Sequence, residues 1–202
     1  MHSRVFPHLL SIALATSLVF GALPPSPAGA HSGGDLIEIR FPQNPYVTEF
    51  SSTFGHARSG GRRHKGNDLL APRMTEVYAA ADGVVIHVGT NRLSGRNLRI
   101  QHPGSWTSHY VHLNNDTPGT DDGRADWSYT VAPGIAEGSF VEAGQLIGWV
   151  GDSGNAERTT PHTHFELRHA GKAINPYPLL VAAYEREIEI RFESLTDTYP
   201  ID

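Results

Sequence analysis

The sequence has 202 residues, no cysteine and 12 histidines, and its 16 Lys and Arg against 21 Asp and Glu give a formal net charge of −5. This length is enough for one globular domain with a proper core. Without cysteine, disulfides and thiolate metal sites are excluded, so a tightly bound metal must use His, Asp, Glu or backbone oxygen. The acidic balance argues against nucleic acid or an anionic membrane surface as the main partner, because both require a positive field.

The first thirty residues have the pattern of an export signal. A start carrying Arg4 leads into an apolar run from Leu9 to Leu23, and Ala28-Gly29-Ala30 is a small-x-small cleavage site. Removal of this signal removes Arg4, so the formal net charge of the mature chain is 15 − 21 = −6. An uncleaved anchor is the alternative, but the run is shorter than the ~20 residues that a spanning helix needs. We expect a mature protein without a transmembrane segment, secreted or periplasmic and associated with the cell envelope.

The chain after the signal is expected to be a leader and first strand over 31–49, a domain over 50–180 and a tail over 181–202. Alternation favours a strand over Leu36–Phe41. Residues 48–61, rich in Ser and Gly, predict loops and turns. Helix-disfavouring residues in His64–Asp68 predict a turn that enters a short strand over 68–70.

Further short strands follow, separated by turns of Gly, Pro and Asn. We expect two around the turn at Ala81-Asp82-Gly83, with 84–88 as a buried strand, then strands over 97–101, 106–113 and on both sides of Gly144. No long amphipathic helix stands out. The pattern predicts an all-β fold, a small antiparallel β-sheet domain with long connecting loops.

Two segments interrupt this rhythm. Residues 114–138 are too long for a hairpin turn and are expected to form a loop that walls a substrate cleft. Its Asp residues do not match the EF-hand spacing, so we interpret it as an acidic surface loop. The tail can begin as a helix at Leu179, and the alternation over Ile188–Glu193 favours an edge strand.

Histidines recur at spacings that suit a metal-dependent hydrolytic site. His162 and His164 stand two residues apart in a strand-like run, so they share one face. His64 and Asp68 stand four residues apart, and His112 lies in another strand-like run. Two His and one Asp leave zinc an open position for water or substrate, and further imidazoles can accept protons. The alternative is a set of surface histidines that happen to alternate.

Several motifs, in this order, resemble the LytM/lysostaphin-type zinc peptidases, which cut peptide bonds in bacterial peptidoglycan. The motifs are His64-Lys65-Gly66-Asn67-Asp68, His112-Leu113 and His162-Thr163-His164, with Ser52-Thr53-Phe54-Gly55, Ala80-Ala81-Asp82-Gly83-Val84-Val85, Gly144-Gln145-Leu146-Ile147-Gly148 and Asn175-Pro176 around them. The resemblance spans roughly residues 50–178. It implies an antiparallel β domain with a groove-shaped active site.

The resemblance also implies a role for individual residues. The zinc ligands of the family fall on His64, Asp68 and His164, which implies one Zn²⁺ per chain. Its two catalytic histidines fall on His112 and His162, and which of them is the formal base stays open.

Neighbouring residues have weaker assignments. Tyr110 shares the predicted face of His112 and is either a contact to substrate or oxyanion or a packed aromatic residue, whereas His109 is expected to face the opposite way. Glu166, two residues after His164, is either a support for that ligand or part of a cross-strand charge pair. Asn67 and Thr163 stand where the family usually has apolar residues, which bears on packing rather than chemistry.

The function implied is that of a zinc metalloendopeptidase that hydrolyses peptide bonds in peptidoglycan stems or cross-bridges. Its partner is the peptidoglycan peptide, with no nucleic acid, and we expect a monomer. The alternative is a catalytically inactive LytM-like regulator that binds and activates another cell-wall hydrolase. A metal-binding or wall-binding module without hydrolysis is a third hypothesis.

Overall fold

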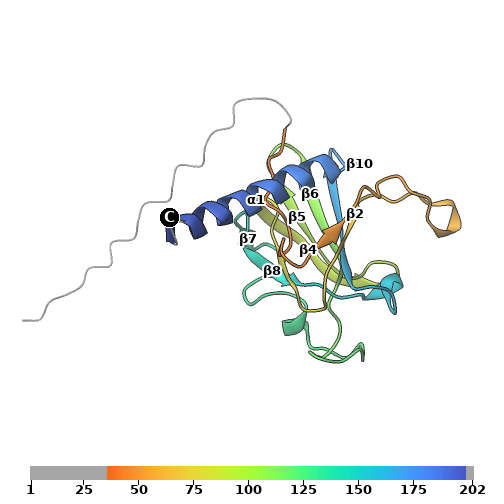
Figure 1. The fold of residues 1–202 in the computed structure, drawn as a ribbon. Coiled ribbons are helices and arrows are strands. Elements are labelled where there is room, and N and C mark those ends of the chain that lie inside the picture. Colours follow the sequence, from red (N-terminus) through yellow and green to blue (C-terminus); the bar gives the residue numbers. More distant parts are fainter. Residues whose placement is uncertain (1–35, 199–202) are drawn as a thin grey trace, which may run out of the picture. The chain divides into compact units, whose positions relative to one another are not determined.

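The computed structural model describes residues 36–198, and its main element is an antiparallel sheet with the strand order β1-β2-β9-β6-β5-β4-β7 (Figure 1). β10 also pairs with β9, and β3 and β8 form a separate pair. The strands are β1 (Glu49–Phe50), β2 (Asn67–Leu70), β3 (Glu76–Tyr78), β4 (Gly83–Asn91), β5 (Gly95–His102), β6 (Trp106–Leu113), β7 (Phe140–Val141), β8 (Leu146–Trp149), β9 (His162–His169) and β10 (Lys172–Ile174). The predicted all-β antiparallel fold is confirmed.

The predicted export signal and its cleavage after Ala30 lie outside the described residues. Within 36–198, the helices include none with both the length and the apolar character needed to cross a membrane.

The core lies on one face of the large sheet, because alternate residues of each strand point into it. Leu98 and Ile100 of β5 are both fully buried in this core, which agrees with the prediction that they share a face. Phe165 and Leu167 of β9 are buried with them. The prediction that 84–88 is buried was wrong in part. Val84 and Ile86 are 40% and 47% exposed, because the second face of an antiparallel sheet can remain in solvent.

The helix α1 (Tyr177–Thr198) includes Ile188–Glu193, so the predicted edge strand there was wrong. Asn175 Oδ1 accepts a hydrogen bond from the Tyr177 amide at 3.1 Å at the start of the helix. Leu180 and Ala183 are fully buried at helical spacing, and Arg186 donates to the Ile39 carbonyl at 2.7 Å. These tertiary contacts favour the helix over the local alternation.

Leu36–Phe41 lies before β1 and has no regular secondary structure, so the strand predicted there was wrong. Arg40 donates its amide to the Ala80 carbonyl at 2.7 Å without a continuous ladder. Ile39 and Phe41 are buried, and the Phe41 ring lies 5.4 Å from that of Tyr184 on α1. The alternation of this segment therefore marks core contacts rather than strand pairing.

Residues 114–138 form a loop, as predicted from the length of this segment. The loop contains the short 3-10 helix η2 (Trp127–Tyr129). The other 3-10 helices are η1 (Ser59–Gly61) and η3 (Gly154–Ala156).

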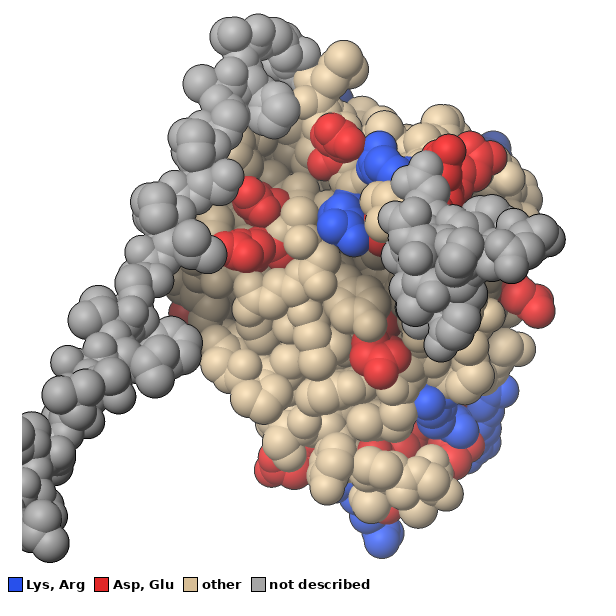
Figure 2. Space-filling view, turned by 60° about the vertical axis from the view of Figure 1, so that its left-hand side comes forward, with Lys and Arg blue, Asp and Glu red and all other residues tan. Residues whose placement is uncertain are grey.

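The face seen in Figure 2 is largely uncharged, with scattered acidic and basic side chains around a broad uncharged area.

Candidate metal centre and active site

β9 carries three polar side chains on one face of the sheet. His162, His164 and Glu166 alternate with Thr163, Phe165 and Leu167, which are fully buried on the other face. The predicted shared face of His162 and His164 is therefore present.

β2 lies beside β9 and brings Asp68 directly opposite His164 in the antiparallel register. His64 enters from the segment just before β2. Gly66 permits this approach, because a Cβ atom at that position would lie 2.1 Å from the Phe165 carbonyl oxygen. The glycine of the His-x-Gly motif thus allows the two segments to pack closely.

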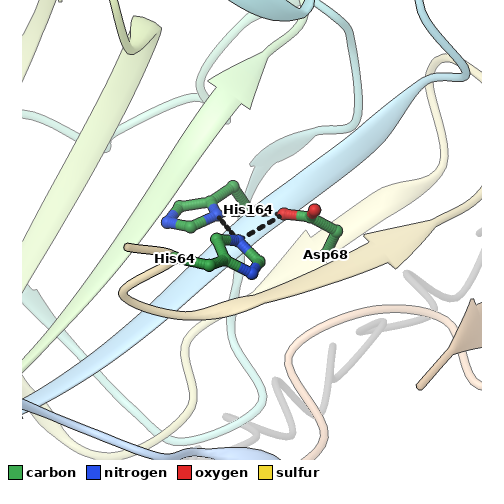
Figure 3. A group of neighbouring side chains, drawn as sticks. All are labelled: His64, Asp68 and His164. Carbon is green, nitrogen blue, oxygen red and sulfur yellow. Dashed lines mark hydrogen bonds and ion pairs between the residues drawn. The ribbon is translucent and has the colours of Figure 1, made fainter. Parts of the chain in front are cut away.

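Three ligand atoms converge between these strands (Figure 3). His64 Nε2 lies 3.0 Å from Asp68 Oδ1 and 2.8 Å from His164 Nδ1, and the last two atoms are 2.9 Å apart. The exposed fractions of the side chains are 3% for His64, 19% for Asp68 and 13% for His164. The cluster is therefore mostly buried but not sealed.

The outer nitrogen of each imidazole is already bonded. His64 Nδ1 donates to the Thr53 carbonyl at 2.9 Å, and His164 Nε2 donates to Glu166 Oε1 at 3.1 Å. With a cation in the cluster, each ring would be neutral, with its proton on this outer nitrogen and a lone pair directed inward. Burial would raise the pKa of Glu166, but His164 and Arg168 outweigh it and lower this pKa to about 2, so the acceptor is ionised.

These residues fit a divalent metal. With both rings neutral, the nitrogen lone pairs of His64 and His164 meet one carboxylate oxygen of Asp68. A cation at this point would be bound by all three ligand atoms. The Arg58 guanidinium donates to Asp68 Oδ2 at 2.5 Å, which favours the ionised carboxylate. Two imidazoles and one carboxylate are a known ligand set for catalytic zinc.

His112 reaches the same face through a left-handed backbone, with φ of +64°. Val111 pairs with His164 on the site face, so strict alternation would bury His112 with Tyr110. The positive φ breaks the alternation, at an energetic cost that proteins accept mainly at functional sites. His112 Nδ1 donates to the Ser153 carbonyl at 2.7 Å, and burial lowers the pKa of His112 to about 4, so the ring is neutral at pH 7.

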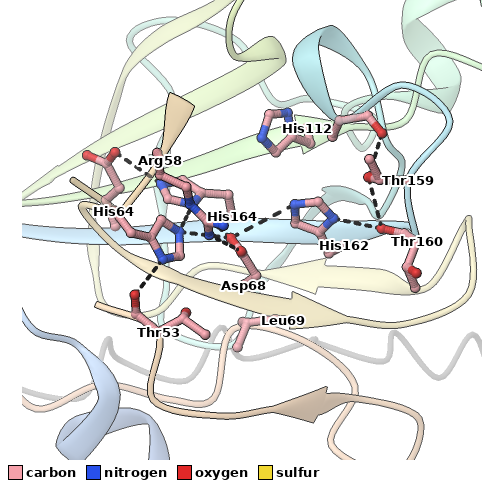
Figure 4. Close-up of polar contacts among 12 residues, drawn as sticks. Thr53, Arg58, His64, Asp68, Leu69, His112, Thr159, Thr160, His162 and His164 are labelled. Atoms are coloured by element: carbon pink, nitrogen blue, oxygen red, sulfur yellow. Dashed lines mark hydrogen bonds and ion pairs between the residues drawn. The ribbon is translucent and has the colours of Figure 1, made fainter. Parts of the chain in front are cut away.

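His162 lies beside His112 and the cluster (Figure 4). Its Nδ1 donates to the Thr160 carbonyl at 2.8 Å, and its Nε2 lies 3.9 Å from Asp68 Oδ1. The centres of the His112 and His162 rings are 5.1 Å apart. Both rings thus keep the proton on Nδ1 and leave Nε2 as a proton acceptor.

Two of the predicted orientations around His112 were wrong. Tyr110 is fully buried, its hydroxyl accepts the Ala80 amide at 2.7 Å, and its ring packs against Phe165, so it does not share the face of His112 and matches the packed-aromatic alternative. His109 faces the site instead, opposite Glu166. The reversed backbone at His112 accounts for both errors.

The cluster opens into a groove of about 710 Å³. Its walls come from residues 58–65, the turn at Leu93 and Ser94, and the loop around η3, with no contribution from 114–138. The prediction that this loop walls the cleft was therefore wrong. Sequence reasoning also missed the carbonyls of Thr53, Ser153 and Thr160, because a backbone acceptor leaves no side-chain signal.

Comparison with known families agrees with this geometry. The model of peptidase family M23 matches residues 62–123 and 127–176, which together make up more than half of the chain. The chain belongs to peptidase family M23. The LytM/lysostaphin resemblance seen in the motifs is thereby confirmed.

Relatives in the M23 family differ in their described activities. The chain is 36% identical over 165 residues to the L-Ala–D-Glu endopeptidase of Bacillus subtilis, which covers 75% of this chain and 45% of that protein. It is 27% identical over 165 residues to the murein hydrolase activator NlpD of Salmonella dublin, which covers 81% of this chain and 37% of that protein. The chain spans less than half the length of these relatives.

Solved structures share the M23 fold. The zinc containing peptidase from Vibrio cholerae has a TM-score of 0.54 and 25% identity, over 68% of this chain and 39% of that chain. The catalytic domain of lysostaphin from Staphylococcus simulans has a TM-score of 0.51 and 25% identity, over 66% of this chain and 92% of that chain.

Proposed function

We propose that this M23 protein is a zinc-dependent endopeptidase that hydrolyses peptide bonds in the stems or cross-bridges of peptidoglycan. The observation that carries the proposal is the convergence of His64, Asp68 and His164, with each imidazole held by a partner on its outer nitrogen. An endopeptidase among its relatives and a zinc containing peptidase among its structural neighbours support it. The proposal includes one zinc per chain, a monomer, and a location outside the cytoplasm in the cell envelope.

Zinc bound by His64, Asp68 and His164 would acidify a water molecule and polarise the scissile carbonyl. The remaining proton transfers belong to His112 and His162. The Nδ1 proton of each is fixed by a backbone carbonyl, so Nε2 of either ring can accept the proton of the attacking water. The protonated ring can then donate a hydrogen bond to the oxyanion and return its proton to the leaving amine.

The test measures zinc by elemental analysis and peptidoglycan digestion with product mass spectrometry, for wild type, His162→Ala and the control His87→Ala on β4. We expect one zinc in all three and cleaved stems from wild type and the control. His162→Ala should lose activity by at least about 100-fold, the usual contribution of a positioned acid-base group. A wild-type protein without zinc, or full activity in His162→Ala, would refute the proposal.

The second candidate function is that of a regulator that activates another cell-wall hydrolase. The observation that favours it is the similarity to a murein hydrolase activator. It predicts that wild type, supplied with zinc, binds peptidoglycan and releases no peptide, while it increases the activity of an added hydrolase. The same digestion assay with and without that hydrolase separates the two functions.

A further inference from the structure

The groove concentrates positive charge in an otherwise acidic protein. Two acidic residues, Asp68 and Glu166, line it. Six basic residues also line it, namely Arg58, Arg62, Arg63, Lys65, Arg99 and Arg168. The lining therefore sums to 6 − 2 = +4, and because the whole chain carries −5, the rest of it carries −9. A groove of opposite sign to the rest of the protein attracts anionic ligands.

Two of the six cations are neutralised within the groove. Arg58 donates to Asp68 Oδ2 at 2.5 Å, and Arg168 donates to Glu166 Oε2 through Nε at 2.8 Å and Nη2 at 2.5 Å. Both carboxylates of the groove therefore already have basic partners.

The other four cations make no ion pair with any residue in 36–190, the range whose side chains the structure describes. Arg62 and Arg63 donate to the carbonyls of Ser59 and Gly55, each at 3.1 Å, and Arg62 also reaches the Ser59 hydroxyl at 3.2 Å. Lys65 and Arg99 have no side-chain hydrogen bond to another residue of this range. Four charges facing one groove are thus available to a ligand.

Three of the available cations lie on one wall: Arg62 and Arg63 belong to an arm of the chain, and Lys65 directly follows it. Residues 55–64 form a two-stranded arm, closed by hydrogen bonds from Gly55 N to His64 O and from Arg58 N to Arg62 O, each 2.9 Å. The arm projects beside β2 with η1 at its tip (Figure 1). The contact between Arg58 and Asp68 connects it to the candidate metal centre.

The fourth available cation lies on the opposite side. Arg99 belongs to β5, which is three places from β2 in the strand order. Three strand spacings correspond to about 14 Å, roughly the length of four extended residues. The cations therefore flank the candidate metal centre at a separation that a short peptide spans.

We propose that the groove selects peptides that carry free carboxylates beside the scissile bond, and that Arg62, Arg63, Lys65 and Arg99 determine this specificity. The inference rests on the proposed endopeptidase function and names its substrate class, an acidic stem peptide rather than its amidated form. Arg binds carboxylate through paired, charge-assisted hydrogen bonds, whereas a carboxamide of the same size offers no charge.

The experiment compares two synthetic stem peptides that differ only in whether their carboxylates are free or amidated. We expect wild type to cleave the free acid with a kcat/KM about tenfold higher, a preference that weakens with added salt. The double variant R62Q/R63Q should reduce the preference to about twofold, mainly through KM. The matched control R124Q/K172Q removes the same charge from exposed sites outside the groove. This control should retain the tenfold preference for the free acid, about as large as in wild type.

The outcomes separate this inference from the function on which it rests. If wild type cleaves neither the peptides nor peptidoglycan, the proposed function fails. If wild type cleaves both peptides equally, or if R124Q/K172Q loses the preference as R62Q/R63Q does, the specificity inference is overturned and the function stands. Because R62Q/R63Q lies near the candidate metal centre, its zinc content is measured, and R99Q on a rigid strand provides an independent variant that should lose part of the preference.

Discussion

Two clusters of potential metal ligands among the described side chains of residues 36–190 differ in what neutralises them. Their members are His64, Asp68 and His164 in the first, and Asp116, Asp121 and Asp152 in the second. Arg73 contacts every carboxylate of the second cluster, through Nη2 to Asp152 at 2.6 Å and to Asp121 at 2.9 Å, and through Nε to Asp116 at 3.2 Å. The second cluster thus already contains its cation.

The first cluster has no such internal cation at the point where its ligand atoms meet. Arg58 contacts Asp68 through Oδ2, whereas Oδ1 is the atom shared with both imidazoles. Both clusters therefore bring ligand atoms close together, and they differ in whether a basic side chain already contacts those atoms. What matters is whether the lone pairs that converge are already satisfied by the protein.

The largest effect should come from exchanging one carboxylate in each cluster. We expect Asp68→Asn to lose zinc and to lower activity by more than about 100-fold, because a metal ligand and its charge are removed. Asp121→Asn removes the same charge from the second cluster and should change neither quantity. Elemental analysis and peptidoglycan digestion measure both, and equal losses in the two variants would contradict the comparison.

Removing the cation of the second cluster should destabilise the fold. Asp152 is fully buried and Asp116 is 1% exposed, so Arg73→Gln leaves both without their countercharge, at a cost of about 2–4 kcal/mol. Urea unfolding measures this loss. Millimolar Ca²⁺ should restore part of the stability in Arg73→Gln and none in wild type, because calcium binds converging carboxylates. A variant as stable as wild type would show that Arg73 does not neutralise the cluster.

Weakening a partner of the first cluster should have an intermediate effect. Glu166→Gln keeps an acceptor oxygen for His164 Nε2 but removes its charge, and we expect zinc affinity to fall about 10- to 100-fold. Competition with a chelator measures the affinity. Glu157→Gln, near η3, is the control and should bind zinc as wild type does. If Glu166→Gln binds equally tightly, the charge on Glu166 does not position His164.

The smallest effect concerns His102, a buried imidazole that the protein satisfies by itself. Its Nδ1 donates to the Asp82 carbonyl at 2.8 Å, and its Nε2 lies 2.8 Å from the Ser108 hydroxyl. Burial lowers the pKa of His102 below the ordinary 6.5, so below about pH 6.5 the unfolded chain binds a proton that the folded protein does not.

Stability should therefore fall on acidification through this window, by at most about 1.4 kcal/mol per pH unit from this group. The free energy of unfolding, measured from pH 7 to 5.5, should have a smaller slope in His102→Gln than in wild type. Identical slopes would mean that His102 does not remain neutral in the folded state.

Strands that bury one face were predictable from the sequence. The strand over 106–113 follows from the turn residues that precede it, and the polar face of His162 and His164 follows from alternation, because side chains two residues apart in a strand share a face. The ligand set followed from motifs in a fixed order rather than from any single spacing. Its assignment to zinc remains a prediction that the proposed experiments test.

Where the sequence misled, a tertiary contact outweighed a local pattern. α1 continues through the alternation at Ile188–Glu193, and residues 36–41 contact the core without joining a strand. Tyr110 and His109 exchanged their expected faces because one left-handed residue, His112, interrupts the period. Alternation counts positions along a chain and contains no information about such a reversal.

The sequence by itself determined the antiparallel β class and the family and indicated the candidate metal ligands, because these depend on residue types, motif order and local periodicity. Only the tertiary structure decided which nitrogen of each imidazole faces the cluster, which cations of the groove remain available, and that Arg73 fills the acidic cluster. Those properties depend on groups far apart in the chain, such as Thr53 with His64 or Arg73 with Asp152, and come into contact only when the sheet and its loops are assembled.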